Sequence, residues 1–484
     1  MPHTARMEEF VKIVCEQIRF KRARAGVARE LMDHMCDQKQ AYCWQGLEDT
    51  EAEKKAVEQM GDPVTVGMQM DLTHRPKPQW GLFVLTAALL LVGIGLQWAL
   101  FGQGDPSGQL SVTLIAAAVG VLGMAGAYFA DYTVLARAPL VIYWIFLAVA
   151  FVHFACLPII NGAGQRGTLL FLLFPAVFAG VAFHFRQKGY GGLLASYGLM
   201  ALGVLACMRA FSVRLGVLIL IACLLLLTLM VGNGQFRVKK RWALPLLYLP
   251  VAGGCAVFAW GYWGRLMTAF SSEEGLGYLT TVTRQLISGA VLIGPGTTAD
   301  SLARLPELDT SYVLTFLIVK FGWIPFFLVV GLFAAFFGYA VFRCLRQTGL
   351  LARMTSTAIL STLLIETLFY LAANLGFLEL STLPLPLLSY GGTGLVLHMV
   401  LIGFLLSVFR CGSMEGPAPY VSQESGRVQV ADGVLSIRSK GFRGPLKWAF
   451  RVNPRDGSCT KKRPCRICGL SFLADSTDSG FPWA

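Results

Sequence analysis

The 484-residue sequence contains little charge. Asp, Glu, Lys and Arg make up only 14% of the residues, whereas hydrophobic residues make up 55%. About a quarter of the residues in an ordinary soluble chain are charged. A larger apolar core cannot account for this deficit. The composition therefore excludes an ordinary soluble protein and predicts that much of the surface contacts lipid.

Acidic residues do not exceed basic ones in this sequence, and its first residues form no apolar stretch. Its formal net charge is +13, and the basic residues are scattered between apolar stretches. This scatter favours membrane lipids as partners and argues against nucleic acid, because no basic module is present. About seventy polar and charged residues precede the first apolar run. We expect no signal peptide, and we expect that run to act as an internal signal anchor.

Metal-binding patterns are absent as well. Several of the 12 cysteines lie inside apolar stretches, where they are expected to be small buried residues. Cys459, Cys465 and Cys468 lie close together near the end of the chain, but no fourth ligand stands at the spacing of a zinc site. We therefore predict no metal site.

Residues 1–77 predict a small cytoplasmic helical domain. Val27, Leu31 and Met35 recur every four residues and form one apolar stripe. Thr50 is expected to be a helix N-cap, and Pro63 is expected at the first position of a further helix. The segment resembles the helical prefix domain that precedes many membrane proteins of Gram-positive bacteria. A generic bundle of three or four helices is the alternative.

Residues 78–410 predict an all-α, polytopic membrane domain. It contains ten apolar segments, most of them with the ~20 residues that a membrane-spanning helix needs. The eighth segment is long and carries Gly322 and Pro325, which predicts a kink or an extension beyond the bilayer. The segments are Trp80–Phe101, Leu110–Ala130, Ala138–Leu157, Thr168–Phe185, Gly191–Phe211, Leu215–Gly232, Leu244–Tyr262, Tyr312–Phe342, Thr357–Leu378 and Leu387–Phe409.

The charges of the loops predict the orientation. The loops that would face the cytoplasm, if the N-terminus does, hold most of the basic residues, and the short loops on the opposite side hold only Arg166, Arg209 and Arg214. Both termini are therefore expected in the cytoplasm, and the long loop 263–311 is expected outside, lying on the membrane surface. Residues 411–484 form a polar, basic tail rich in Gly and Ser, which we expect to be largely disordered.

Two segments carry a more specific signal. The first is "LPLPLLSYGGTG", Leu383 to Gly394, and the second runs from Gly277 to Trp323. Two prolines and paired glycines keep the first segment non-helical, which is tolerated at membrane depth only inside protein or beside a cavity. Ser389 and Tyr390 would then point hydroxyl groups into a polar site. The alternative is a simple turn into a helix, with Ser389 as its N-cap.

Together the two segments resemble the FtsW/RodA/SpoVE family of bacterial cell-wall proteins, also called SEDS proteins. The resemblance rests on a Pro-Leu-Pro run followed by Ser-Tyr-Gly-Gly, and on Gly-Tyr, spaced glycines and Leu-Pro-Glu in the long loop. It covers roughly residues 80–410. It implies ten spans with both termini inside and a role in cell division, cell shape or sporulation. It further implies lipid II as substrate, polymerisation of glycan strands, and a class B penicillin-binding transpeptidase as partner.

The site implied by this resemblance is altered. The family has Leu-Pro-Glu-x-His-Thr-Asp-Phe, with the Asp as its essential carboxylate. Here Ser311 stands at the Asp position and Asp309 at the His position. Lys320 replaces an acidic residue of the next helix, and Glu366 and Tyr370 stand where the family has Gln and Asn. One interpretation makes Asp309 the shifted carboxylate, with Glu307 in reserve. The other makes the chain a catalytically lapsed scaffold.

Polymerisation needs a base for the acceptor hydroxyl and positive charge for the leaving pyrophosphate. Asp309 is the candidate base. Lys320 and Glu366 are expected to line one polar cavity, since neither can face lipid cheaply. No cofactor is required by the pattern, although a divalent cation, Mg²⁺ or Mn²⁺, could serve the pyrophosphate. Transport of a lipid-linked precursor is a third hypothesis. The candidate substrate-binding residues are Arg284, Arg304, Lys320, Glu366, Ser389 and Tyr390.

Overall fold

The computed structural model divides into two compact units, Met1–Gly416 and Pro417–Ala484. The residues that it describes are 5–73, 78–101, 109–156, 168–210, 212–271, 277–306, 308–377 and 383–411, together with three short strands between residues 429 and 451.

The first 73 residues contain four helices around a small apolar core. The stripe predicted from Val27, Leu31 and Met35 is buried in this core together with Val14. The fourth helix begins at Pro63, as predicted, whereas Thr50 lies inside the third helix. The expected N-cap at Thr50 is wrong, because that helix already begins at Asp49. The helices are α1 (Ala5–Gln17), α2 (Lys21–Trp44), α3 (Asp49–Gln59) and α4 (Pro63–Thr73).

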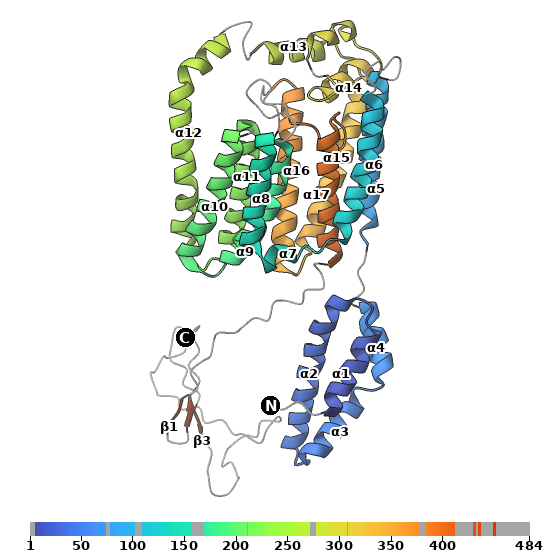
Figure 1. Ribbon diagram of the computed structural model, residues 1–484, viewed down its shortest axis with the longest axis vertical. Helices are drawn as coiled ribbons and strands as arrows, with labels where there is room; N and C mark the ends of the chain where they lie inside the picture. The colour runs from blue at the N-terminus through green and yellow to red at the C-terminus, as the bar shows by residue number, and fades with distance from the viewer. Residues whose placement is uncertain are drawn as a thin grey trace, which may run out of the picture. The chain divides into compact units, whose positions relative to one another are not determined.

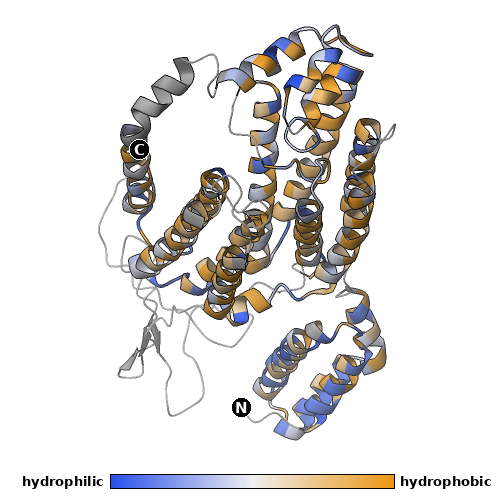
Figure 2. Cartoon of the chain, turned by 45° about the horizontal axis from the view of Figure 1, so that its top comes forward, coloured by the Kyte–Doolittle hydropathy of each residue, from blue (hydrophilic) through white to orange (hydrophobic). Residues whose placement is uncertain are grey.

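The membrane domain is all helical, as expected, and each of the ten predicted segments overlaps a helix (Figures 1 and 2). Seven of these helices are long and apolar enough to cross a bilayer. They are α5 (Trp80–Phe101), α6 (Gln109–Phe129), α10 (Gly189–Ala210), α11 (Val213–Gly232), α15 (Trp323–Leu345), α16 (Leu350–Asn374) and α17 (Gly392–Cys411).

The other apolar segments are shorter or extend further. A one-turn helix, α7 (Val134–Arg137), precedes α8 (Pro139–Cys156) at one end of the bundle (Figure 1). The 3₁₀ turn η1 (Thr168–Leu173) continues directly into α9 (Phe174–Phe185). The seventh predicted segment lies within the long helix α12 (Lys240–Ser271).

The eighth predicted segment is two helices and not one. Gly322 has φ +98°, a left-handed conformation that favours glycine, and it separates α14 (Val313–Phe321) from α15. A loop crosses this break and pairs with it. The Trp323 amide donates to the Val291 carbonyl at 3.1 Å, and the Gly296 amide donates to the Val319 carbonyl at 2.8 Å. The chain therefore turns sharply at Gly322. Pro325 lies in the first turn of α15, where a backbone amide has no helical partner to lose.

The segment before this break covers one end of the bundle. It contains α13 (Gly277–Ser288) and the 3₁₀ turn η2 (Ala299–Arg304), and Figure 1 shows α13 and α14 at the same end. Val282 and Leu286 of α13 are buried in a cluster with Leu302, Tyr312 and Phe316. The apolar face of α13 thus packs on η2 and α14. The amphipathic pattern of α13 thus reflects packing inside the protein, and the expectation that the long loop lies on the membrane surface stays a prediction.

The second unit contains three short antiparallel strands in the order β1-β2-β3. In this sheet Val430 pairs with Leu435, and Leu435 pairs with Phe450. The rest of residues 417–484 lies outside the described residues, so the expectation of a largely disordered tail stays a prediction. The strands are β1 (Gln429–Ala431), β2 (Val434–Ser436) and β3 (Ala449–Arg451).

Candidate functional site

The two sequence motifs meet at the end of the bundle that carries α13 and α14. The Tyr390 amide donates a hydrogen bond of 2.9 Å to the Asp309 carbonyl. The Gln97 side-chain amide of α5 donates to the same carbonyl at 3.2 Å and to the Leu388 carbonyl at 3.1 Å. Segments far apart in the sequence are therefore joined directly, and the loop that carries Asp309 has a defined place beside the motif.

The Tyr370 hydroxyl of α16 forms hydrogen bonds with both segments of this junction. It donates to the Thr310 carbonyl at 3.0 Å and accepts from the Val313 amide at 3.0 Å. The Ser389 hydroxyl donates to it at 3.3 Å. One fully buried hydroxyl thus connects the loop, the start of α14 and the motif. The bonds with the Val313 amide and the Ser389 hydroxyl are buried, so these two are costly to leave unmade.

Asn374, one turn further along α16, holds the next residues of the same corner. Its Nδ2 donates to the Ser311 carbonyl at 2.9 Å, and its Oδ1 accepts from the Thr315 amide at 3.0 Å. Sequence reasoning did not find the positioning roles of Gln97, Tyr370 or Asn374. The available signal was the four-residue spacing of Tyr370 and Asn374, which places both side chains on one face of α16.

The Pro-Leu-Pro motif has the buried, non-helical backbone that the sequence predicts. Leu387 adopts a left-handed φ of +67°, and Leu385, Leu387, Leu388 and Ser389 are all buried. Gly93 of α5 lies so close that a Cβ atom there would overlap the Leu387 carbonyl oxygen. The motif therefore packs against protein on this side, as non-helical backbone at membrane depth must.

Ser389 does not cap the helix that follows. Its Oγ accepts from the Leu385 amide at 2.8 Å, and α17 begins only at Gly392. The alternative of a simple helix-entry turn with Ser389 as N-cap is therefore wrong. Tyr390 is half-buried, and its ring contacts that of Phe101 at the end of α5, with the ring centroids 6.1 Å apart.

Asp309 and Ser311 differ in accessibility. Ser311 is only 2% exposed, and its carbonyl binds Asn374 of α16, whereas Asp309 is half-buried. The Asp309 carboxylate also lies within electrostatic range of the Tyr370 hydroxyl. Of these two positions, Asp309 is the one that a substrate can reach without rearrangement of the corner. Glu307, the reserve carboxylate, lies outside the described residues.

The three candidate cations are dispersed around this end of the bundle. The Arg284 Nε donates to the Gly376 carbonyl at 2.8 Å, just beyond the C-terminal end of α16. A cation at this position interacts favourably with the helix dipole. Arg304 is exposed on η2, and Lys320 is exposed at the end of α14. The structure thus assigns a contact within the protein to Arg284 only.

Glu366 does not share a cavity with Lys320, and that expectation is wrong. Its Oε2 lies 3.0 Å from the His398 Nε2 of α17, and the two side chains are 0% and 1% exposed. Glu366 faces α17 inside the bundle, whereas Lys320 is exposed. Sequence reasoning missed His398, which lies in the apolar middle of α17.

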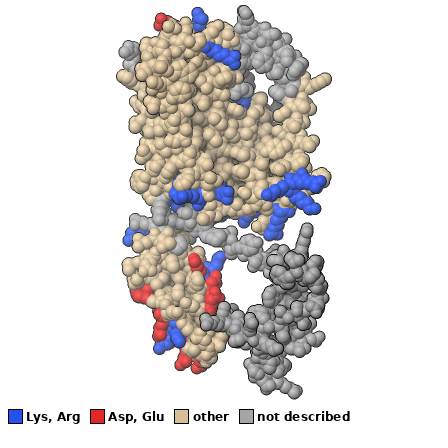
Figure 3. Space-filling view, turned by 180° about the vertical axis from the view of Figure 1, so that it is seen from behind, with Lys and Arg blue, Asp and Glu red and all other residues tan. Residues whose placement is uncertain are grey.

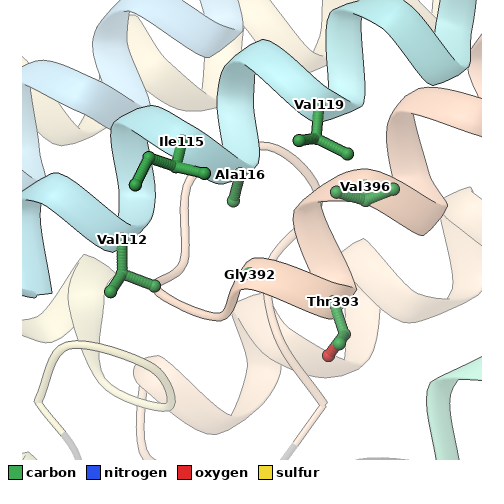
Figure 4. A pocket seen from close by; sticks show the side chains of 7 residues that line it. All are labelled: Val112, Ile115, Ala116, Val119, Gly392, Thr393 and Val396. Atoms are coloured by element: carbon green, nitrogen blue, oxygen red, sulfur yellow. The ribbon is translucent and has the colours of Figure 1, made fainter.

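An apolar groove of about 360 Å³ lies between α6 and α17 at the C-terminal end of the motif (Figure 4). Thr393 provides the only side-chain hydroxyl among its lining residues. Such a lining suits neither a sugar nor a pyrophosphate. The lining residues are Val112, Ile115, Ala116, Val119, Gly392, Thr393 and Val396.

The described residues do not build a metal site of their own. Among them, no three His, Cys, Asp or Glu side chains gather closely enough to hold an ion. Mg²⁺ is usually held by one or two carboxylates together with substrate phosphates. The described corner offers the single carboxylate of Asp309, so we derive no step through a cation.

Comparison with known proteins gives partial sequence matches. A probable peptidoglycan glycosyltransferase FtsW of Thioalkalivibrio is 30% identical over 132 residues, which are 26% of this chain and 32% of that protein. Stage V sporulation protein E of Bacillus subtilis is 26% identical over 134 residues, 26% of this chain and 37% of the relative. The chain thus spans only about a third of the length of these relatives. No family model matches the chain.

Solved structures match over a larger part of the fold. One describes the structural coordination of polymerization and crosslinking by a peptidoglycan synthase complex. It has a TM-score of 0.56 and 19% identity, and the match covers 69% of this chain and 98% of that one. The rod-shape-determining protein RodA of Thermus thermophilus has a TM-score of 0.51 and 17% identity, with 69% and 97% covered. The resemblance of residues 1–77 to a prefix domain stays a prediction. The membrane domain is thus similar in part of its sequence to FtsW and SpoVE proteins, and it shares the fold of RodA.

Proposed function

We propose that this protein binds lipid II at the outer face of the bacterial cytoplasmic membrane and polymerises it into glycan strands. The observation that carries the proposal is the junction at Asp309. The Tyr390 amide and the Gln97 side chain both hold its carbonyl, which leaves the carboxylate on a fixed loop beside the motif. Relatives named peptidoglycan glycosyltransferases support the reaction class.

The distribution of charge supports the orientation. Figure 3 shows most Lys and Arg side chains of the membrane domain at the end opposite α13 and α14. By the positive-inside rule this basic end faces the cytoplasm. Both termini would then be cytoplasmic, and the Asp309 corner would face outward, where lipid II is consumed. The basic residues are Arg137, Arg186, Lys188, Arg237, Lys239, Lys240, Arg241, Arg343, Arg346, Arg353 and Arg410.

In the proposed reaction Asp309 acts as general base. Its carboxylate takes the proton from the acceptor sugar hydroxyl as that oxygen attacks the anomeric carbon of the donor. The bond from this carbon to the pyrophosphate breaks, and the pyrophosphate leaves with its electron pair. Exposed Arg304 and Lys320, and the terminal nitrogens of Arg284, are the cations available to offset the charge that develops.

A lapsed scaffold is the second candidate, and one observation favours it. Ser311 stands where the family motif has its essential Asp, and α16 encloses it. A serine hydroxyl without an adjacent base is far too weak to take a proton. In this case the chain would keep the fold and assemble with other cell-wall proteins, among them a class B penicillin-binding transpeptidase.

Purified full-length protein in vesicles, supplied with lipid II and with or without such a transpeptidase, separates these functions. Glycan strands formed by the wild type would support the enzyme. Absence of strands with the wild type, but their formation by Ser311→Asp, would support the lapsed scaffold. Movement of labelled lipid II across the vesicle membrane without strands would support a transporter and contradict polymerisation.

A further inference from the structure

The Glu366–His398 pair is the one ionisable cluster inside the described bundle that the proposed reaction does not use. The pair joins α16 to α17, which pack side by side beneath α14 (Figure 1). Glu366 Oε1 is buried and has no hydrogen-bond partner among the described residues. Ionisable residues within membrane spans are costly and are retained mostly where they serve function.

The cost of burying this pair is limited by its hydrogen bond. Two buried polar side chains that bond to each other avoid part of the penalty of burying each one without a partner. Removal of either partner would leave the other buried without it, which is strongly unfavourable.

The position of Glu366 on α16 connects the pair to the Asp309 corner. Glu366, Tyr370 and Asn374 are spaced by four residues, so they lie on one helix face within about 12 Å along the axis. Glu366 contacts α17, Tyr370 contacts the loop and the motif, and Asn374 contacts the start of α14. One face of α16 therefore carries the contacts that this helix makes with the Asp309 loop, the motif, the start of α14 and α17.

We propose that Glu366 and His398 are positioning residues, whose buried hydrogen bond fixes the rotation and height of α16 and thereby the loop that carries Asp309. Among the described residues, neither side chain of the pair hydrogen-bonds to Asp309 or to the motif, so the pair acts through Tyr370 and Asn374. Its effect on polymerisation rests on the proposed function. Its effect on the geometry of the corner does not.

Two backbone amides report this geometry directly. The Val313 amide is held by the Tyr370 hydroxyl, and the Thr315 amide is held by the Asn374 side chain. Both lie in the first turn of α14, where helical partners for amides are missing. Their hydrogen exchange therefore depends on the side chains of α16 and rises if α16 shifts.

The test is hydrogen exchange of full-length protein in vesicles. His398→Leu should raise exchange at Val313 and Thr315 by about tenfold or more, while amides of α10 keep their protection. Glu366→Gln, which can still donate to the imidazole, should stay within about threefold of the wild type. The reciprocal exchange, Glu366→His with His398→Glu, should restore protection. Ser407→Ala, which removes a hydrogen bond from the opposite end of α17, is the matched control and should leave both amides unchanged.

Unchanged exchange at Val313 and Thr315 in His398→Leu would overturn the proposal, as would equal loss in Glu366→Gln and Glu366→Leu. If His398→Leu also loses protection in α10, the bundle has unfolded, and the reciprocal double variant then decides. Wild-type protein that makes no glycan strands would contradict the proposed function without touching this result. In an active protein, polymerisation should fall in His398→Leu and survive in Glu366→Gln.

Discussion

The backbone of Tyr390 binds the backbone of Asp309, with 2.9 Å between the amide nitrogen and the carbonyl oxygen. The hydrogen bond joins the non-helical segment before α17 to the loop before α14. Because it uses main-chain atoms, its formation depends on the path of both segments and not on either side chain. The Asp309 carboxylate remains available for chemistry, while its place in space is set by the surrounding helices.

Loss of the Tyr370 hydroxyl should disconnect this corner. Tyr370→Phe leaves the Val313 amide, the Thr310 carbonyl and the Ser389 hydroxyl without their shared partner. We expect a loss of about 1–3 kcal/mol in the free energy of unfolding, together with a large loss of polymerisation. Tyr143→Phe is the matched control, because its buried hydroxyl donates to the Leu199 carbonyl elsewhere in the bundle. It should cost comparable stability and leave the polymerisation rate intact; an equal loss of activity in both variants would contradict the role of Tyr370.

Close packing between α5 and the motif gives a second prediction. Gly93→Ala places a methyl group onto the Leu387 carbonyl oxygen, so the motif must move. Overpacking of this kind typically costs about 1–3 kcal/mol. Gly95→Ala on the same helix has open space within 4 Å and should be tolerated. Thermal unfolding and the polymerisation assay should separate the two variants, and similar behaviour of both would refute the close approach.

The sequence predicted much of this architecture and missed its connections. Hydropathy alone located the ten apolar segments, because a bilayer requires long apolar helices. Gly322 and Pro325 indicated a break in the eighth segment, although not that a loop would pair with it. The pairing of Lys320 with Glu366 was wrong, because a helical period does not reveal which helix a face will meet. Gln97 and His398 were missed for the same reason: each makes its contact with a residue distant in the sequence.

The first four helices offer a test of pH dependence. The Thr65 hydroxyl and amide donate to the Asp62 carboxylate at 2.7 and 2.8 Å, which lowers the pKa of Asp62 below its ordinary value. A lowered folded-state pKa gives a stabilising effect that is complete above the unfolded-state pKa, about 3.9, and is lost as pH falls through the folded value. Protection of α4 amides from hydrogen exchange should therefore decline below about pH 4.

Asp62→Asn should remove this dependence, because the amide does not titrate, whereas Asp33→Asn on the exposed side of α2 should preserve it. If α4 protection in the wild type falls equally in Asp62→Asn, another group controls the transition.

Topology can be tested with cysteines introduced at the two ends of the bundle. Tyr278→Cys on α13 should react with a membrane-impermeant thiol reagent added outside intact cells, because this end is proposed to face outward. Arg346→Cys at the basic end should react only after the membrane is opened. The parent protein, with its native cysteines, sets the background. The reverse pattern would invert the orientation and place Asp309 on the cytoplasmic side, away from the proposed reaction.

The polymerisation rate of Asp309→Asn, measured with purified full-length protein and lipid II, tests the central claim most directly. The substitution is nearly isosteric and keeps the backbone carbonyl that Tyr390 and Gln97 bind. Asp300→Asn, an exposed acid on η2, is the matched control and should retain the wild-type rate. If Asp309 is the general base, its loss should lower the rate by about 10²–10⁴-fold while the protein remains folded. Full activity in Asp309→Asn would contradict the account and direct the search to Glu307.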